Sequence, residues 1–205
     1  MWNIFNKNSS PIREAEQVSE AERALNTWGI KYKKTASGTL FVPGNLDISV
    51  KDLLSLPDLR QVKVGGDFYC NSNVLSSLKG APQSIGGSFW CQNNFLTSLE
   101  HAPKSVGGNF WCSNNHWLLS LEGAPQSVGG DFHCSENPLT SLEYAPQTFN
   151  QLKSDFGVFG SWQEVPETLR LSPLTKILQR EAAIQSSTVL LAPLTVKGPL
   201  RLKIN

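Results

Sequence analysis

The chain has 205 residues, enough for one sizeable core or one repeat array with end caps. Hydrophobic residues make up 40% of it and charged residues 17%, which excludes a disordered polyelectrolyte. The formal net charge of +1 gives no indication of a nucleic-acid or membrane partner, and no apolar run approaches the roughly 20 residues that a membrane-spanning helix needs.

The chain before the repeats predicts a cap made of a helix and a hairpin. Ser10-Pro11 is a typical helix start, and Ser19 with Glu22 forms a capping box in the same stretch. Residues 30–34 and 39–42 follow as two strand-like runs separated by a turn. Because the N-terminus lacks the basic start and apolar run of a signal peptide, we also expect a cytoplasmic location.

Four near copies of one unit fill the middle of the chain. Each reads Gly-Gly-x-Phe-x-Cys-x-x-Asn-x-Leu-x-x-Leu-x-x-Ala-Pro, with one inserted residue near His116 in the third copy. A degenerate copy starts at Gly44, and a further one begins at Phe149 and breaks down. Self-similarity at a period of 21–22 residues predicts a solenoid of about five turns. The four copies are Gly65–Pro82, Gly86–Pro103, Gly107–Pro125 and Gly129–Pro146.

The spacing inside each unit predicts a short strand and an extended return path. Phe and Cys lie two residues apart, so both face the interior from a strand with one buried side. The two leucines turn inward on the return path, and Ile85, Val106 and Val128 close the turns. One turn cannot bury its apolar side alone, so stacked turns share one core. The inward phenylalanines are Phe68, Phe89, Phe110 and Phe132.

Asparagine and cysteine also recur once per turn, and we interpret both as structural. Inside such a coil, an asparagine amide can satisfy backbone groups that the bend leaves unpaired. Cysteines in a line about 4.8 Å apart suit neither a tetrahedral zinc site nor a disulfide. We therefore expect buried thiols in a reducing compartment, with no metal and no cofactor. The two columns are Asn73, Asn94, Asn115 and Asn137, and Cys70, Cys91, Cys112 and Cys134.

After the array, the sequence predicts helices and a strand-like tail. Ser172-Pro173 starts a helix that runs to about Gln185, and residues 162–169 predict a shorter helix before it. Residues 188–204 are strand-like but interrupted by proline. The chain thus divides into an N-terminal helix and hairpin cap at 1–43, the repeat array at 44–149, and a C-terminal helix and tail at 150–205.

The repeat unit resembles the bacterial type of leucine-rich repeat, in which the return path is extended and rich in proline. It is most similar to the Gly-Gly-Asp-Phe-x-Cys…Asn-x-Leu-x-Ser-Leu-x-Gly-Ala-Pro arrays of bacteriophage and prophage proteins, over residues 39–149. The resemblance implies a leucine-rich-repeat-like solenoid with a parallel sheet on its concave face and a cofactor-free binding role. Together with the helical caps that the flanking segments predict at both ends, the expected fold class is α+β. Some secreted bacterial repeat proteins add a ubiquitin-ligase domain with a catalytic cysteine, but no cysteine follows Cys134.

The residue between Phe and Cys in each strand faces away from the core, which predicts an aromatic stripe on the outer face of the sheet. Exposed Tyr and Trp in a row, beside small polar groups and acids, are typical of protein-binding surfaces. The alternative is that these rings stack across strands only to stabilise the sheet. The predicted partner-binding residues are Asp47, Asp67, Tyr69, Trp90, Gln92, Asn109, Trp111, Asp131 and His133.

The sequence favours a protein-binding scaffold that is not an enzyme. A phage-encoded chain of this kind would act in the host cytoplasm, for example by inhibiting a host defence or metabolic protein, and this use rests on the resemblance alone. The alternative is a carbohydrate-binding module in which sugars stack on the same stripe. Nucleic acid is not expected, because the stripe lacks interleaved Lys or Arg. Catalysis is not expected either, because none of His101, His116 and His133 belongs to a recognisable set of catalytic or metal-binding residues.

Overall fold

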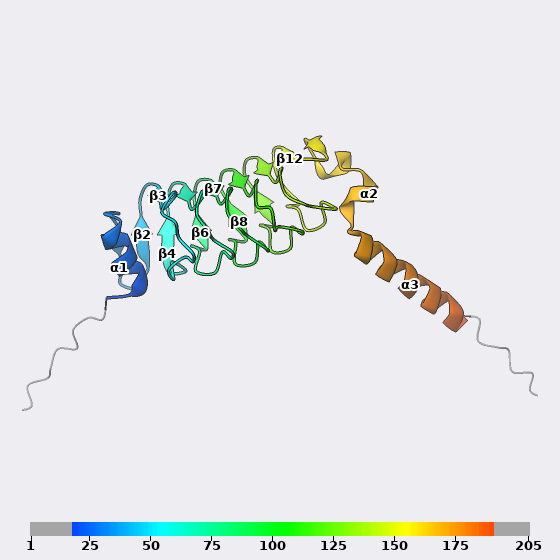
Figure 1. Ribbon diagram of the computed structural model, residues 1–205. Helices are drawn as coiled ribbons and strands as arrows, with labels where there is room; N and C mark the ends of the chain where they lie inside the picture. Colours follow the sequence, from blue (N-terminus) through cyan, green and yellow to red (C-terminus); the bar gives the residue numbers. More distant parts are fainter. Residues whose placement is uncertain (1–17, 191–205) are drawn as a thin grey trace, which may run out of the picture.

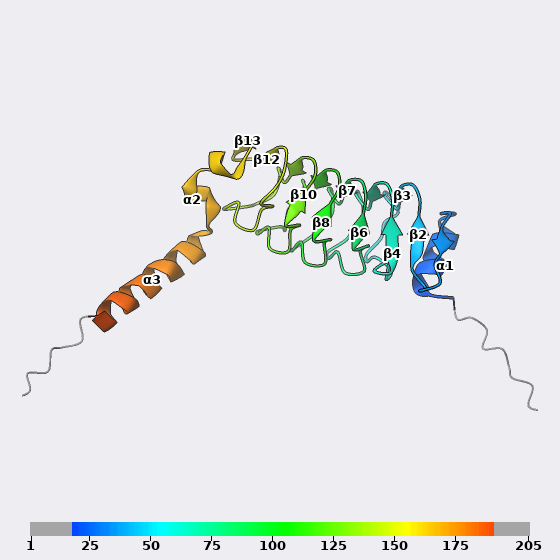
Figure 2. The ribbon, with the colours of Figure 1, turned by 180° about the vertical axis from the view of Figure 1, so that it is seen from behind.

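The computed structural model describes residues 18–190, which form a parallel β-solenoid of about five turns (Figure 1). Within these residues, helices lie only towards the two ends of the array. Successive turns stack side by side, so the array is elongated along the stacking direction when seen from either side (Figures 1 and 2). The prediction of a repeat solenoid is therefore confirmed.

One side of each turn contributes to a seven-stranded sheet, here named the long sheet. It consists of β3 (Leu46–Asp47), β5 (Phe68–Tyr69), β7 (Phe89–Trp90), β9 (Phe110–Trp111), β11 (Phe132–His133), β12 (Leu152–Ser154) and β13 (Gly157–Phe159), in the order β13-β12-β11-β9-β7-β5-β3. Pairing is parallel from β3 to β12, and within the repeats it joins equivalent residues, for example Trp90 with Trp111. β13 then returns antiparallel to β12, so the repeat breaks down here.

The described chain forms two further sheets, of which the sequence predicted only the hairpin of residues 30–34 and 39–42. A four-stranded sheet has the order β1 (Lys33–Lys34), β2 (Leu40–Val42), β4 (Val62–Val64) and β6 (Ser84–Ile85), and β8 (Ser105–Val106) pairs with β10 (Ser127–Val128). Ile85, Val106 and Val128 were expected only to close each turn. They lie in strands because equivalent extended segments of successive turns come into register, so their backbone groups pair.

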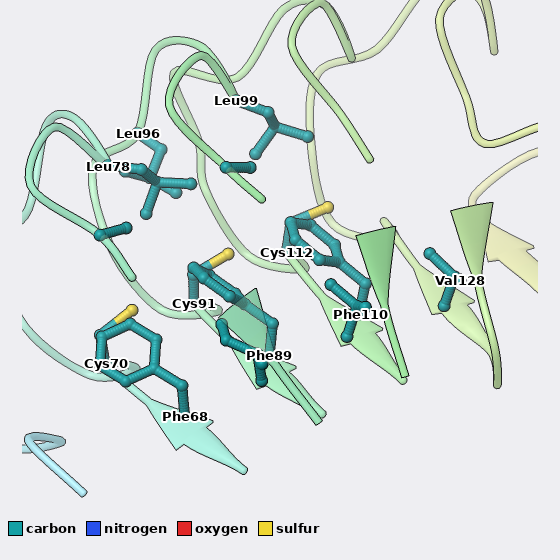
Figure 3. Packing of buried hydrophobic residues seen from close by; sticks show 14 of the residues in the cluster. Phe68, Cys70, Leu78, Phe89, Cys91, Leu96, Leu99, Phe110, Cys112 and Val128 are labelled. Atoms are coloured by element: carbon teal, nitrogen blue, oxygen red, sulfur yellow. The ribbon is translucent and has the colours of Figure 1, made fainter. Parts of the chain in front are cut away.

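Apolar side chains from the sheets and the loops meet in one core. The inward Phe and Cys columns are fully buried, as predicted. Figure 3 shows these side chains in successive turns, with leucines such as Leu96 and Leu99 facing them from the loops. The prediction that the phenylalanines face the interior, on which the orientation of the aromatic stripe depends, is confirmed.

Glycine is required where successive turns approach each other most closely. A Cβ atom on Gly86 would lie 2.4 Å from the carbonyl oxygen of Gly65, and one on Gly107 would lie 2.1 Å from that of Gly86. Both distances are far shorter than a van der Waals contact, so close backbone approach excludes any larger residue. Gly44, at the start of the array, has no neighbour within 4 Å of such an atom.

At the N-terminal end, α1 (Glu20–Thr27) packs against the first turn through the fully buried Leu25. The predicted capping box forms: Ser19 Oγ accepts the Glu22 N–H at 3.1 Å, and the Ser19 N–H donates to Glu22 Oε2 at 3.0 Å. The predicted hairpin is the antiparallel pair of β1 and β2. The predicted helix start at Ser10-Pro11 lies outside the described residues.

The helices at the C-terminal end differ from those that the sequence predicted. Residues 162–169 do not form one helix: a 3-10 turn, η1 (Trp162–Glu164), and α2 (Glu167–Arg170) are separated by Pro166, which holds the preceding residue in an extended conformation. α3 (Pro173–Leu190) continues beyond Gln185, so residues 188–190 are helical rather than strand-like. The rest of the predicted tail lies outside the described residues.

α3 also does not cover the last turn of the array. It projects away from the solenoid in both views (Figures 1 and 2), and its apolar side chains remain exposed. The prediction of a C-terminal helical cap is therefore not confirmed. The exposed apolar residues are Leu174, Ile177, Leu178 and Ile184.

Candidate functional site

Four aromatic side chains form one continuous column on the solvent side of the long sheet. We name Tyr69, Trp90, Trp111 and His133 the outer ring column. Their ring centroids are 5.6, 4.7 and 3.4 Å apart in chain order, with interplanar angles of 19°, 6° and 8°. The column forms because parallel strands in register place equivalent residues about 4.8 Å apart, close to the spacing of stacked rings.

The rings of this column differ in exposure. Tyr69, Trp90 and Trp111 are half-buried, whereas His133 is only 8% exposed. The expectation that His133 lies exposed on the face is therefore wrong. Strand alternation predicts which side a residue faces, but the stacked ring of Trp111 and the neighbouring Lys153 remove His133 from solvent.

Stacking determines which parts of the rings a ligand can reach. Trp90 has a ring on each of its two faces, and so does Trp111, so only the ring edges are open to solvent. Aromatic edges carry the positive part of the ring quadrupole and favour hydrogen-bond acceptors or the faces of other rings. Tyr69 ends the column and has a stacked neighbour on one face only.

The polar residues beside the column form a backbone-capping ladder. Asn45 Oδ1 accepts the Asp67 N–H at 2.9 Å, and Asp67 Oδ1 accepts the Ser88 N–H at 2.6 Å. Ser88 Oγ then accepts the Asn109 N–H at 3.0 Å, and Asn109 Oδ1 accepts the Asp131 N–H at 2.8 Å. Asp67 and Asn109, which the sequence marked as partner-binding residues, therefore also bind each turn to the next.

The carboxylates of Asp67 and Asp131 lie beside the rings at the two ends of the column. Asp67 Oδ2 accepts the Tyr69 O–H at 2.8 Å. Asp131 Oδ2 lies 2.9 Å from Lys153 Nζ and 3.7 Å from His133 Nε2. Lys153 was missed by the sequence reasoning, because it lies after the last complete repeat and only the pairing of β11 with β12 brings it beside His133.

Burial and charge set the protonation of the two end rings. Burial lowers the pKa of His133, Lys153 lowers it further, and Asp131 opposes both effects only in part, so the imidazole is neutral at pH 7. The hydrogen bond to Asp67 is the largest cause of the raised pKa of Tyr69, and burial and the carboxylates of Asp67 and Asp47 add to it. Both end rings are therefore uncharged at neutral pH.

Three buried polar atoms at this site have no hydrogen-bond partner. They are Trp90 Nε1, Trp111 Nε1 and Gln92 Oε1, and no other buried side-chain nitrogen or oxygen in residues 18–185 is left unpaired. Leaving such an atom unpaired costs about 1–3 kcal/mol. Two donors and one acceptor of this kind, together on one face, distinguish the outer ring column from the rest of the described surface.

The asparagine column bonds to the backbone of successive turns, as expected, and the cysteine column is buried, as expected. Asn94 Nδ2 donates to the carbonyl oxygens of Cys70 at 3.0 Å and Cys91 at 3.1 Å, and its Oδ1 accepts the Leu75 N–H at 3.1 Å. The cysteines are free, and burial raises the pKa of every thiol in the column, so the thiolate is disfavoured. No group of acidic, histidine or cysteine side chains within residues 18–190 could hold a metal ion.

A second set of exposed apolar side chains was not identified from the sequence. Trp117 is 63% exposed, and Phe95 and Leu119 are also exposed. Trp117 lies at the one-residue insertion of the third repeat, which was the available signal. His101 and His116 are exposed at turns and do not join the outer ring column.

The described residues define a class of structure, a parallel β-solenoid with one face of stacked, half-buried aromatic rings. Comparison of the chain with protein-family models, with curated proteins and with solved structures finds no match. Of the helices in the described part, none is both long and apolar enough to cross a membrane.

Proposed function

We propose that the chain is a protein-binding scaffold, of the leucine-rich-repeat-like type found in phage proteins, that engages a partner protein through the outer ring column. The observation that carries this proposal is the column itself: rings from four adjacent strands, three of them half-buried, with two indole N–H groups that are buried and have no hydrogen-bond partner. The proposed use of a phage-encoded chain, inhibition of a host protein, rests on the repeat resemblance alone.

The geometry of the column supports binding because its side chains are already ordered. Trp and Tyr dominate the energetics of many protein interfaces, and side chains held rigidly before binding lose little conformational entropy. Stacking fixes Trp90 and Trp111, and the hydrogen bond to Asp67 fixes Tyr69. The capping ladder keeps the flanking backbone in register. A partner would meet a rigid surface with a hydrophobic centre and a polar rim.

Stabilisation of the sheet does not by itself account for the column. The inner phenylalanine rings already contact one another from turn to turn on the buried side of the same strands, edge-to-face between Phe68 and Phe89 and stacked in the next two pairs. Unpaired indole N–H groups reduce stability rather than add to it. The carbohydrate alternative is less favoured, because sugars stack on ring faces and the faces of Trp90 and Trp111 are occupied by their neighbours.

The test compares capture by the immobilised full-length chain and by two matched double variants, from a lysate of the native host, read by mass spectrometry. Trp90→Ala/Trp111→Ala should reduce capture of the specific partner about tenfold or more, because central interface aromatics cost about 2 kcal/mol or more when truncated. Phe95→Ala/Trp117→Ala, which removes two exposed rings elsewhere, should leave capture unchanged. If Trp90→Ala/Trp111→Ala does not fold, Trp111→Phe, which keeps a stacked ring but removes the indole, replaces it in the capture experiment.

Circular dichroism and thermal unfolding establish that the variants are folded. If every protein retained by the unaltered chain is retained equally by a folded Trp90→Ala/Trp111→Ala variant, the outer ring column is not the binding surface. If only the Phe95→Ala/Trp117→Ala variant loses capture, the binding surface lies at the third-repeat insertion and not at the outer ring column.

A further inference from the structure

We propose that the outer ring column ends, beside Tyr69, at a site for a guanidinium group, which an arginine side chain of the bound partner occupies. The site consists of the outer face of the Tyr69 ring and the carboxylates of Asp47 and Asp67. This inference rests on the proposed protein-binding function and specifies the chemistry that the partner brings to one end of the column.

The column stops at Tyr69 because the next position in register carries no ring. Asp47 on β3 pairs with Tyr69 on β5, and the side chain of Asp47 bends along its own strand. Its Oδ1 accepts the N–H of Ser49 at 2.9 Å and the Oγ–H of the same residue at 2.7 Å. Asp47 is exposed, and its Oδ2 makes no hydrogen bond to any described residue. Tyr69 therefore has an aromatic neighbour on one face only, and the residue in register beyond it carries a carboxylate oxygen without a hydrogen bond to any described residue.

The opposite end of the column contains the group that this end lacks. There His133 is the last ring, Lys153 takes the next position in register, and Lys153 Nζ lies 2.9 Å from Asp131 Oδ2. Asp131 precedes His133 by two residues, as Asp67 precedes Tyr69. One end of the column thus combines a ring, a carboxylate and a cation, whereas the other combines a ring with two carboxylates.

The charge at the Tyr69 end is not neutralised by the described chain. No lysine or arginine within residues 18–190 forms an ion pair with Asp47 or Asp67. Residues 44–146 as a whole carry nine acidic and five basic side chains. A cationic group is therefore the complementary occupant. The raised pKa of Tyr69, to which both carboxylates contribute, agrees with a negative potential at this ring.

A guanidinium fits the site better than an ammonium group. It is planar, so it can lie parallel to the Tyr69 ring and continue the column by one step. Its forked N–H groups can donate to the free oxygen of Asp47 while the plane stays stacked. An ammonium is a compact and strongly hydrated charge that gains nothing from the planar surface. The hydrogen bond to Asp67 holds the Tyr69 ring in place before the cation arrives.

The test uses small probes on the isotopically labelled full-length protein. N-acetyl-L-arginine N-methylamide, its neutral citrulline isostere and the corresponding lysine derivative are titrated while backbone amide NMR signals are followed. The arginine probe should give saturable shifts centred on Asp47, Ile48 and Tyr69, and the citrulline probe should not saturate. Asp47→Asn should weaken the arginine probe about fivefold, and Glu100→Gln, which neutralises an exposed acid elsewhere, should not change it.

Each outcome decides between the two proposals. Equal, non-saturating responses to the arginine and citrulline probes, or unchanged affinity in Asp47→Asn, overturn the guanidinium site while leaving partner capture through Trp90 and Trp111 untouched. Equal affinity for the lysine probe overturns the choice of a planar cation. If instead the arginine probe binds as expected but capture does not depend on the tryptophans, the protein-binding function of the column fails and the cation site stands.

Discussion

Each face of the long sheet carries a column of rings, and the two columns have different consequences. The inner column of Phe68, Phe89, Phe110 and Phe132 has ring centroids 5.3, 5.1 and 5.5 Å apart, and the outer ring column has similar spacings over Tyr69, Trp90 and Trp111. The inner rings are fully buried, whereas most of the outer rings are half-buried and two of them keep unpaired N–H groups. Register alone therefore creates ring columns, and burial decides whether a column stabilises the fold or remains available for binding.

The largest expected effect is a difference in stability loss between an inner-column variant and an outer-column variant. Phe110→Ala should lower the free energy of unfolding by about 3–5 kcal/mol, because it leaves a cavity in a closed core. Trp111→Ala, next to it on the opposite face, should cost about 1–2 kcal/mol, mainly from lost stacking. Urea unfolding measures both. Equal losses in the two variants would mean that the outer rings are as much a part of the core as the inner ones.

A second variant tests the spacing on which both columns depend. Gly107→Ala should lower the free energy of unfolding by about 1–3 kcal/mol, because its Cβ would lie 2.1 Å from the carbonyl oxygen of Gly86 and would force the turns apart. Gly44→Ala is the matched control, since no atom lies within 4 Å of its added Cβ, and it should unfold like the unaltered chain. Trp fluorescence should change in Gly107→Ala as the outer rings separate. A Gly107→Ala variant as stable as Gly44→Ala would contradict the close approach of the turns.

The smallest expected effect is a pH dependence that only the outer column can show. The pKa of His133 in the folded protein is below its ordinary value of 6.5, so the unfolded chain binds more protons over the interval below 6.5. Stability should therefore fall as the pH is lowered through 6.5 towards the folded-state pKa. His133→Phe keeps a stacked ring and removes the titration, so thermal unfolding between pH 7 and pH 5 should show a smaller loss. His116→Gln, at an exposed turn, should retain the original dependence.

Several features could be predicted from the sequence because they follow from local periodicity. The two-residue spacing of Phe68 and Cys70, repeated every 21 or 22 residues, was enough to orient the strands and to assign the inner column. The recurrence of Asn94 and its equivalents likewise predicted a buried ladder, and its hydrogen bonds to the carbonyls of two turns confirm it. The capping box at Ser19 was read from four consecutive residues.

Other features depended on contacts between turns and could not be read from one unit. The role of Asp67 as a cap for the Ser88 N–H appears only when two turns are placed in register. The burial of His133 and the presence of Lys153 beside it depend on how β12 joins the sheet after the last complete repeat. The apolar stripe of α3 predicted a helix packed against the array. Such a stripe does not specify whether the chain provides a surface for the helix to pack against, so the projection of α3 could not be predicted.

By itself, the sequence determined a stack of turns with phenylalanine inside and tyrosine or tryptophan outside, because a strand alternates its side chains between two faces. Only the tertiary structure decided which outer rings remain accessible, which carboxylates are already occupied by backbone N–H groups, and which end of the column lacks a cation. Those properties arise between neighbouring turns, where side chains about 4.8 Å apart compete for the same space and the same hydrogen bonds.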